Sequence, residues 1–175
     1  MKKINITPKV AIDNIELGMT RDTVHKIMGN KYFEMVRDSV LSDSYDDILL
    51  KICYENEIVN FIEISSNPGI SVFYKETDIF QTKAENLIAY LKQYGDYLDT
   101  SEAQWGNSYI FEELGIALYR TAVFKEESIN EPWFQELSPE HKEDELRFLY
   151  FEAVAVFGEG YYDTVKDMLI INKQV

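Results

Sequence analysis

The chain has 175 residues, of which 46% are hydrophobic and 14% aromatic, and this is enough apolar side chain for one packed domain or two small fused units. Its 31 acidic residues outnumber 17 basic ones, giving a formal net charge of −14 at pH 7. Such a charge repels nucleic acid and anionic membranes and favours basic partners, although acidic composition also serves solubility alone. We therefore expect neither a nucleic-acid nor a membrane partner.

Cysteine usage and the first residues favour a cytoplasmic location. Cys53 is the only cysteine, so no intrachain disulfide is possible, and its apolar neighbours predict a buried side chain. Residues 1–8 contain two lysines but no apolar segment behind them, so we do not expect a signal peptide. No run approaches the roughly 18 apolar residues that a membrane-spanning helix needs.

The first half of the chain predicts one short helix among strands. Thr20 is a good N-cap residue and Gly29 suits the end of a helix, with Val24, Ile27 and Met28 forming an apolar stripe between them. A polar turn region is expected at 38–47, and the short polar connection at 55–57 predicts a β-hairpin. The expected strands are an edge strand around Ile4 and Ile6, then Tyr32–Val36, Ile48–Tyr54, Ile58–Ser65 and Ile70–Tyr74.

The second half repeats the order of a helix followed by strands. Thr82 and Glu85 form a capping box that predicts a helix start, and Gly95 is expected to end that helix. This repetition predicts an α+β fold with two helix-plus-antiparallel-sheet units in tandem, residues 1–78 and 79–175, whose helices pack on the sheet. One compact domain is the alternative. Strands are expected at Tyr109–Phe111, Leu114–Tyr119 and Leu146–Phe157.

An acidic insertion near residues 121–145 interrupts the second unit. It combines many carboxylates with the aromatic pair Trp133 and Phe134. One interpretation is a solvated loop and short helix whose aromatics pack at the edge of the core. The other is a partner-binding surface in which aromatic anchors are surrounded by charge. On the second interpretation the candidate contact residues are Trp133, Phe134, Glu136 and Glu140 in the insertion, and Tyr45, Asp46 and Asp47 in the first polar loop.

The groups that catalysis or metal binding requires are sparse in this sequence. His25 follows Asp22 by three residues, an arrangement typical of a surface pair, and His141 has only Glu145 nearby as a second metal ligand. A zinc site needs three or four ligands with more His or Cys. We therefore expect no catalytic site, no metal and no cofactor.

Two other functions remain open at the level of the sequence. A small enzyme or ligand-binding domain would use the concave face of the sheet, with Cys53, Tyr109 or His25 lining it. A homodimer would pair through an exposed strand edge.

The segment from Leu17 to Gly29, followed by Ile52 to Ile64, resembles one helix-plus-sheet unit of the β-lactamase inhibitor protein fold, which small outer-membrane assembly lipoproteins share. Residues 107–120 and 151–163 are similar to uncharacterised bacterial proteins that include toxin immunity proteins. The chain lacks the lipid-attachment cysteine and the paired cysteines of those groups, which removes the lipoprotein role and the disulfides. The resemblance implies an immunity protein that binds a toxin, and the acidic charge of the chain favours a toxin with a basic surface. We expect the chain to be a monomer or weak homodimer.

Overall fold

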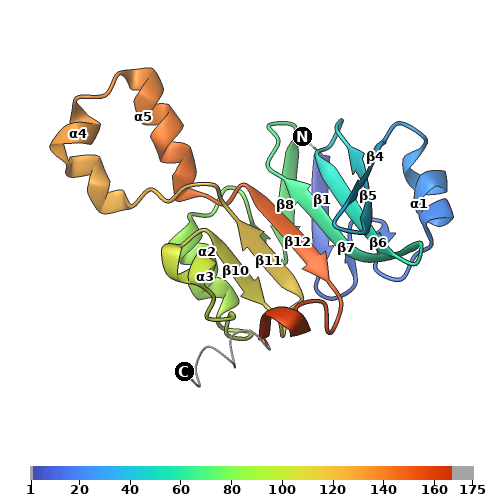
Figure 1. Cartoon of the computed structure of the whole chain (residues 1–175). Helices are drawn as coiled ribbons and strands as arrows, with labels where there is room; N and C mark the ends of the chain where they lie inside the picture. The colour runs from blue at the N-terminus through green and yellow to red at the C-terminus, as the bar shows by residue number, and fades with distance from the viewer. Residues whose placement is uncertain (1, 167–175) are drawn as a thin grey trace.

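The fold is built around a sheet of seven antiparallel strands. The computed structural model describes residues 2–166, and all statements below concern these residues. Both predicted units contribute strands to this sheet, because β12 pairs with β7 (Figure 1). In spatial order the strands are β10 (Ser108–Phe111), β11 (Ile116–Tyr119), β12 (Ala153–Phe157), β7 (Ile58–Ser65), β6 (Leu50–Glu55), β5 (Val40–Tyr45) and β4 (Phe33–Arg37).

A second, smaller sheet contains the N-terminal strand at its centre. Ile4 on β1 lies opposite Val72 on β8 in a parallel pair, and β2 pairs with the other side of β1. The expectation of an edge strand around Ile4 and Ile6 is therefore wrong, because both sides of β1 are paired. The strand order is β3 (Ile15–Glu16), β2 (Ala11–Ile12), β1 (Lys2–Thr7), β8 (Ile70–Tyr74) and β9 (Thr77–Asp78).

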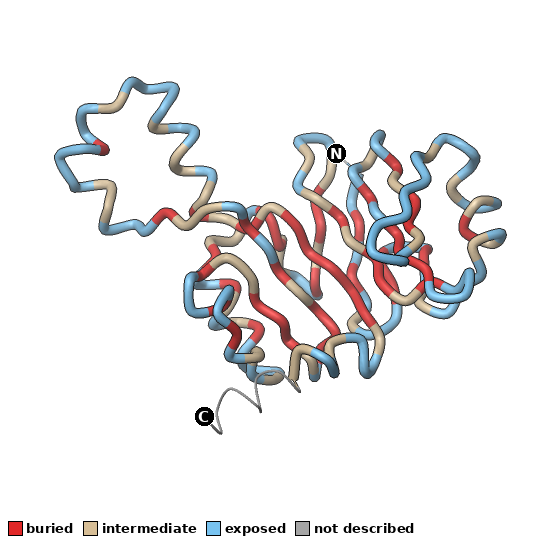
Figure 2. Tube along the Cα trace, in the orientation of Figure 1, coloured by how far each residue is buried: buried red, intermediate tan, exposed pale blue. Residues whose placement is uncertain are grey.

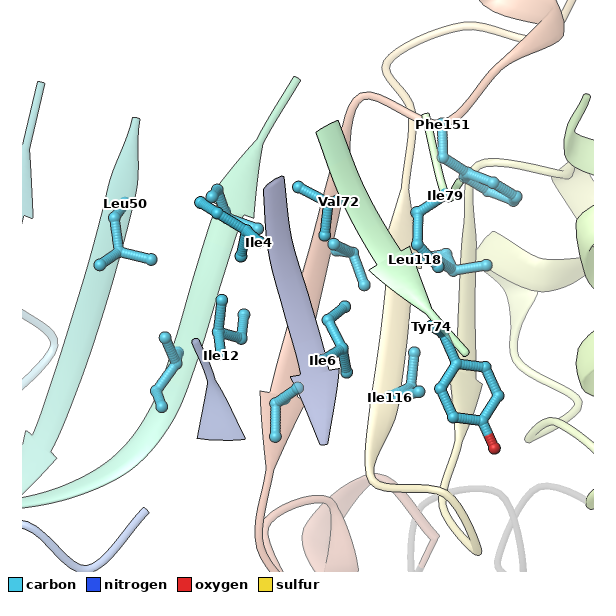
Figure 3. Packing of buried hydrophobic residues seen from close by; sticks show 14 of the residues in the cluster. Ile4, Ile6, Ile12, Leu50, Val72, Tyr74, Ile79, Ile116, Leu118 and Phe151 are labelled. Carbon is cyan, nitrogen blue, oxygen red and sulfur yellow. The ribbon is translucent and has the colours of Figure 1, made fainter. Parts of the chain in front are cut away.

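The main hydrophobic core lies between the two sheets. Ile4 and Val72 from the smaller sheet belong to the same buried cluster as Leu50 and Leu118 from the larger one (Figure 3). The buried residues are concentrated in the strands of the two sheets (Figure 2). The helices α1 (Arg21–Met28), α2 (Ala84–Leu91) and α3 (Ser101–Trp105) each contribute a buried residue to this cluster. The expected α+β class is confirmed.

The predicted N-terminal cap is confirmed for the first helix and wrong for the second. Thr20 caps α1 as expected, because its hydroxyl accepts from the backbone N–H of Thr23. The capping box at Thr82 is wrong: the Thr82 hydroxyl instead donates to the carbonyl of Asp78, and α2 begins at Ala84 without a side-chain cap. This helix also ends at Leu91, before the predicted Gly95.

Two segments were assigned to the wrong secondary structure: a polar segment predicted as a turn and an apolar segment predicted as one long strand. Most of the expected turn region at 38–47 is the strand β5, which is joined to β4 by a two-residue turn at Asp38 and Ser39, both with positive φ. The first part of the expected strand Leu146–Phe157 is instead the end of the helix α5 and a 3₁₀ turn, so that β12 begins only at Ala153.

Most of the other predicted elements agree with the structure, but the short strands β2, β3 and β9 and the helix α3 were not predicted. The predicted hairpin is β6 and β7, with positive φ at Asn56 and Glu57 in its turn. The strands β4, β8, β10 and β11 lie where aromatic and β-branched residues predicted them. No helix among residues 2–166 is long and apolar enough to cross a bilayer.

Candidate functional site: an acidic arm beside an open sheet face

The acidic insertion forms an arm that stands away from the two sheets. We use "arm" for residues 121–150, which leave the larger sheet after β11 and return to it in the neighbouring strand β12 (Figure 1). Most of its backbone is exposed or half-buried, in contrast to the strands at its base (Figure 2). The arm contains η1 (Glu126–Asn130), α4 (Pro132–Gln135), α5 (Pro139–Leu146) and η2 (Arg147–Leu149).

A small hydrophobic core of its own holds the arm together. Phe124, Phe134 and Leu149 are buried against one another, separately from the core between the sheets. The Phe124 and Phe134 rings lie 5.0 Å apart, which is a favourable distance for an aromatic pair. Ser138 begins α5, since its hydroxyl accepts from the backbone N–H of His141, and Pro139 occupies the first helical position.

The outer surface of the arm is acidic. No residue of α5 (Pro139–Leu146) is buried, so this helix presents its carboxylates to solvent. Glu136 and Glu140, both candidate contact residues, are exposed. Near the base, Glu126 forms an ion pair with Lys83 of the segment before α2, which links the arm to the body of the protein.

The two aromatic candidates in the arm have different environments. Trp133 is 48% exposed and packs edge-on against Phe124, with ring centroids 6.1 Å apart. Phe134 is only 3% exposed and belongs to the core of the arm. Trp133 is therefore available to a partner, whereas Phe134 supports the arm from inside.

The structure does not bring the second set of candidates to the arm. Tyr45 is buried at the end of β5, and its hydroxyl makes no hydrogen bond within residues 2–166. Burial raises the pKa of Tyr45 to about 12. Asp46 and Asp47 follow it and are exposed. Because β5 lies near the opposite end of the larger sheet from β11, these residues and the arm form two separate surfaces (Figure 1).

A hollow opens on the outer face of the larger sheet at the base of the arm. Its volume is about 640 Å³, and Arg147 and Tyr150 of the arm form part of its wall. The strand register accounts for part of the space, because the small residues Ala153 and Ser65 lie opposite each other on neighbouring strands, with Tyr119 on the other side of Ala153.

Glu63 is one of two carboxylates that line this hollow, the other being Glu152, which accepts hydrogen bonds from Thr121. It lies between Lys51 on β6 and Ala155 on β12 in the strand register. Within the described residues no hydrogen bond or ion pair is formed by the side-chain carboxylate of Glu63. Burial raises the pKa of Glu63, and the positive charge of Lys51 partly opposes this effect. The hollow therefore offers a mixed polar and apolar surface to an incoming side chain or small molecule, with the carboxylates of Glu63 and Glu152 and the basic Arg147 in its lining.

A buried ionic cluster, which the sequence patterns did not reveal, joins α1 to β5. Asp43 has no exposed side-chain surface and accepts two hydrogen bonds from Arg21, at 2.9 Å from Nε and 2.6 Å from a terminal nitrogen. His25 Nε2 lies 2.8 Å from the same carboxylate. Burial favours a raised pKa for Asp43, but the hydrogen bonds from Arg21 and His25, with the Tyr54 hydroxyl nearby, lower its pKa overall.

The geometry of this cluster fits a structural link between helix and sheet. The carboxylate of Asp43 is ionised and only accepts hydrogen bonds, so His25 Nε2 donates to it. The His25 ring stacks on Tyr32, with centroids 4.3 Å apart, which restricts its movement. The prediction of an ordinary surface pair for His25 is wrong, because its partner is the buried Asp43 rather than Asp22. The spacing of Arg21 and His25, four residues apart on one helix face, was the available signal.

The residues proposed for an enzyme or ligand site do not form one constellation. Cys53 is buried on the outer face of the larger sheet, where burial raises the pKa of its thiol. Tyr109 belongs to the core between the sheets, and His25 to the cluster at α1. Among residues 2–166, no group of three or more His, Cys, Asp or Glu residues is arranged to hold a metal ion.

Comparisons with protein-family models, with curated proteins and with solved structures found no match to this chain.

Proposed function

We propose that this protein is a non-catalytic binding protein, specifically an immunity protein that neutralises a toxin by covering it. The observation that carries the proposal is the arm, which exposes Trp133 among carboxylates such as Glu136 and Glu140. Exposed aromatic residues of this kind dominate the energy of many protein interfaces. The resemblance to the β-lactamase inhibitor protein fold supports the same class of function.

The arm is suited to binding because it is already folded. Its own core fixes the shape of the acidic surface, so that association would cost little ordering of the chain. The net charge of −14 would accelerate encounter with a toxin that has a basic surface, and the carboxylates of the arm would select such a partner. The proposal includes a cytoplasmic location, where a single buried thiol such as Cys53 stays reduced.

The test uses a toxin encoded beside this chain, expressed in cells with and without the chain. The wild-type chain should restore growth, and the double variant Glu136→Lys with Glu140→Lys should bind the purified toxin about tenfold more weakly or worse. Trp133→Ala should cost about 2 kcal/mol or more of binding free energy, as expected for an aromatic anchor.

The matched control reverses the same number of charges at the other candidate surface. Asp46→Lys with Asp47→Lys should leave toxin binding within about twofold of wild type, because these residues are remote from the arm. If that variant alone lost binding, the contact would lie at the end of β5. A chain that binds no such toxin and does not restore growth would contradict the proposed function.

The hollow at Glu63 favours a second candidate function, the binding of a small ligand on the open sheet face. Its volume of about 640 Å³ lies within the range of small-molecule sites. A thermal-shift screen of metabolites and metal ions tests this candidate. A rise of several degrees in melting temperature that disappears in Glu63→Gln would support it, and a screen without any shift would count against it.

A further inference from the structure

The edge strand β4 of the larger sheet is unusually exposed and apolar. All five of its residues are exposed, including Phe33 at 68%, Met35 at 51% and Val36 at 65%. An unprotected edge strand offers unpaired backbone N–H and C=O groups to another strand, and native proteins usually protect such edges. β4 is short, but its apolar side chains make it a surface that another strand would stabilise.

The turn between β4 and β5 determines which backbone groups are free. In a two-residue turn the flanking residues, here Arg37 and Val40, form a hydrogen-bonded pair. Because such pairs alternate along an antiparallel ladder, Met35 and Phe33 also direct their backbone groups towards β5. The N–H and C=O groups of Glu34 and Val36 consequently point away from the sheet, towards solvent.

We propose that β4 pairs with β4 of a second copy of this chain, forming a homodimer whose two larger sheets join edge to edge. A two-fold axis perpendicular to the sheet at Met35 places Glu34 opposite Val36 of the second copy. These are the residues whose backbone groups are free, so each such pair exchanges two hydrogen bonds. Met35 then lies opposite Met35, and Phe33 opposite Arg37, where a cation–π contact is available.

The charges along this edge are compatible with a second copy. Although the whole chain carries −14, the edge combines Lys31 and Arg37 with Glu34 and Asp38. In the proposed register Lys31 comes opposite Ser39 of the second copy, one residue from its Asp38, at both ends of the interface. Long-range repulsion between two acidic chains still opposes association, so the dimer should strengthen when salt screens that repulsion.

The proposed dimer is independent of the arm. β4 lies at the opposite end of the larger sheet from β10, and the arm leaves from the strands next to β10 (Figure 1). Both arms would therefore remain accessible in the dimer. This inference goes beyond the proposed function, and either one can fail without the other.

A disulfide introduced at the two-fold axis tests the register directly. Met35→Cys should form a covalent dimer on mild oxidation, because the Cα atoms of a directly opposed pair without hydrogen bonds are about 4.5 Å apart, within disulfide range. Phe33→Cys is the matched control, since its cysteine would face Arg37 and lie about 14 Å from its counterpart. The native thiol of Cys53 is buried and should not interfere.

Sedimentation of the unmodified chain provides the second measurement. The wild type should show a monomer–dimer equilibrium that shifts towards the dimer at higher salt, and Val36→Pro should be monomeric because proline removes a free N–H without breaking a bond to β5. Circular dichroism would show that this variant is folded. A wild type that stays monomeric at high concentration and in high salt would overturn the proposal, as would equal cross-linking of Met35→Cys and Phe33→Cys.

Discussion

At the scale of single residues, Asp43 is the most deeply buried charged residue in the part of the chain that the structure describes. It is fully buried, and its two strongest contacts come from one helix, through Arg21 and His25. Removing one partner from a buried ionic group leaves the others without compensation, which usually costs more than the group contributes when intact. The cluster therefore stabilises the position of α1 against β5, although burying it is itself expensive.

The variant Asp43→Asn should lower the free energy of unfolding by about 3 kcal/mol, because Arg21 loses its buried counter-ion and keeps only the exposed Glu34 as an ionic partner. The pH dependence has a definite sign. The pKa of Asp43 is lowered by folding, so its stabilising effect is present above its unfolded pKa of about 4 and is lost as the pH falls through the folded value. Urea unfolding between pH 7 and pH 3 should show a steeper loss of stability in the wild type than in the variant.

Asp46→Asn is the control for this comparison, because Asp46 is exposed and three residues away. It should change the free energy of unfolding by about 0.5 kcal/mol or less and leave the pH dependence as in the wild type. Equal stability of Asp43→Asn and Asp46→Asn would show that the buried cluster contributes nothing to the fold.

At the scale of elements, the arm should behave as a separate cooperative segment. Phe134→Ala removes the centre of its small core, a change that costs about 3–5 kcal/mol at a buried site. Hydrogen exchange should therefore become fast in α4 and α5, while the strands of the larger sheet keep their protection. Trp133→Ala, at a half-exposed position, should leave exchange in the arm nearly unchanged. Loss of protection throughout the sheet in Phe134→Ala would contradict an independent arm.

Element prediction succeeded where local patterns and long-range packing agree. The hairpin of β6 and β7 could be predicted from the sequence because alternating apolar residues flank a short polar turn. β5 was missed because the polar run Ser42-Asp43-Ser44 is typical of a turn, and only the distant Arg21 makes Asp43 acceptable inside the protein. The central position of β1 could likewise not be predicted, since its partner β8 lies about seventy residues away in the sequence.

The candidate site was predictable in part for the same reason. Composition alone indicated an acidic insertion with aromatic residues, and the structure shows it as the arm. Which aromatic residue is buried depends on packing within the arm, so sequence could not separate Trp133 from Phe134. The hollow at Glu63 depends on the register of three strands that are far apart in the sequence, and no local pattern records that register.

At the scale of the whole molecule, the sheet joins the two predicted units. Ile64 on β7 lies between Leu50 of the first unit and Val154 of the second, and it is completely buried. The core between the sheets also draws residues from both units. Because the two units share a sheet and a core, they should unfold in one cooperative transition.

The variant Ile64→Ala tests whether the two units unfold together, because Ile64 lies where β7 of the first unit pairs with β12 of the second. Deleting a buried isoleucine side chain should lower the free energy of unfolding by about 2–5 kcal/mol. The unfolding midpoint in urea should fall equally when it is followed by hydrogen exchange at Leu118, which reports on β11 in the second unit, and at Ile52, which reports on β6 in the first. Ile27→Ala is the control, because Ile27 is exposed on α1 and its loss should change the midpoint little. If the two probes of Ile64→Ala separated, with one unit melting while the other stayed folded, the pairing of β7 with β12 would join two independently stable domains rather than one cooperative structure.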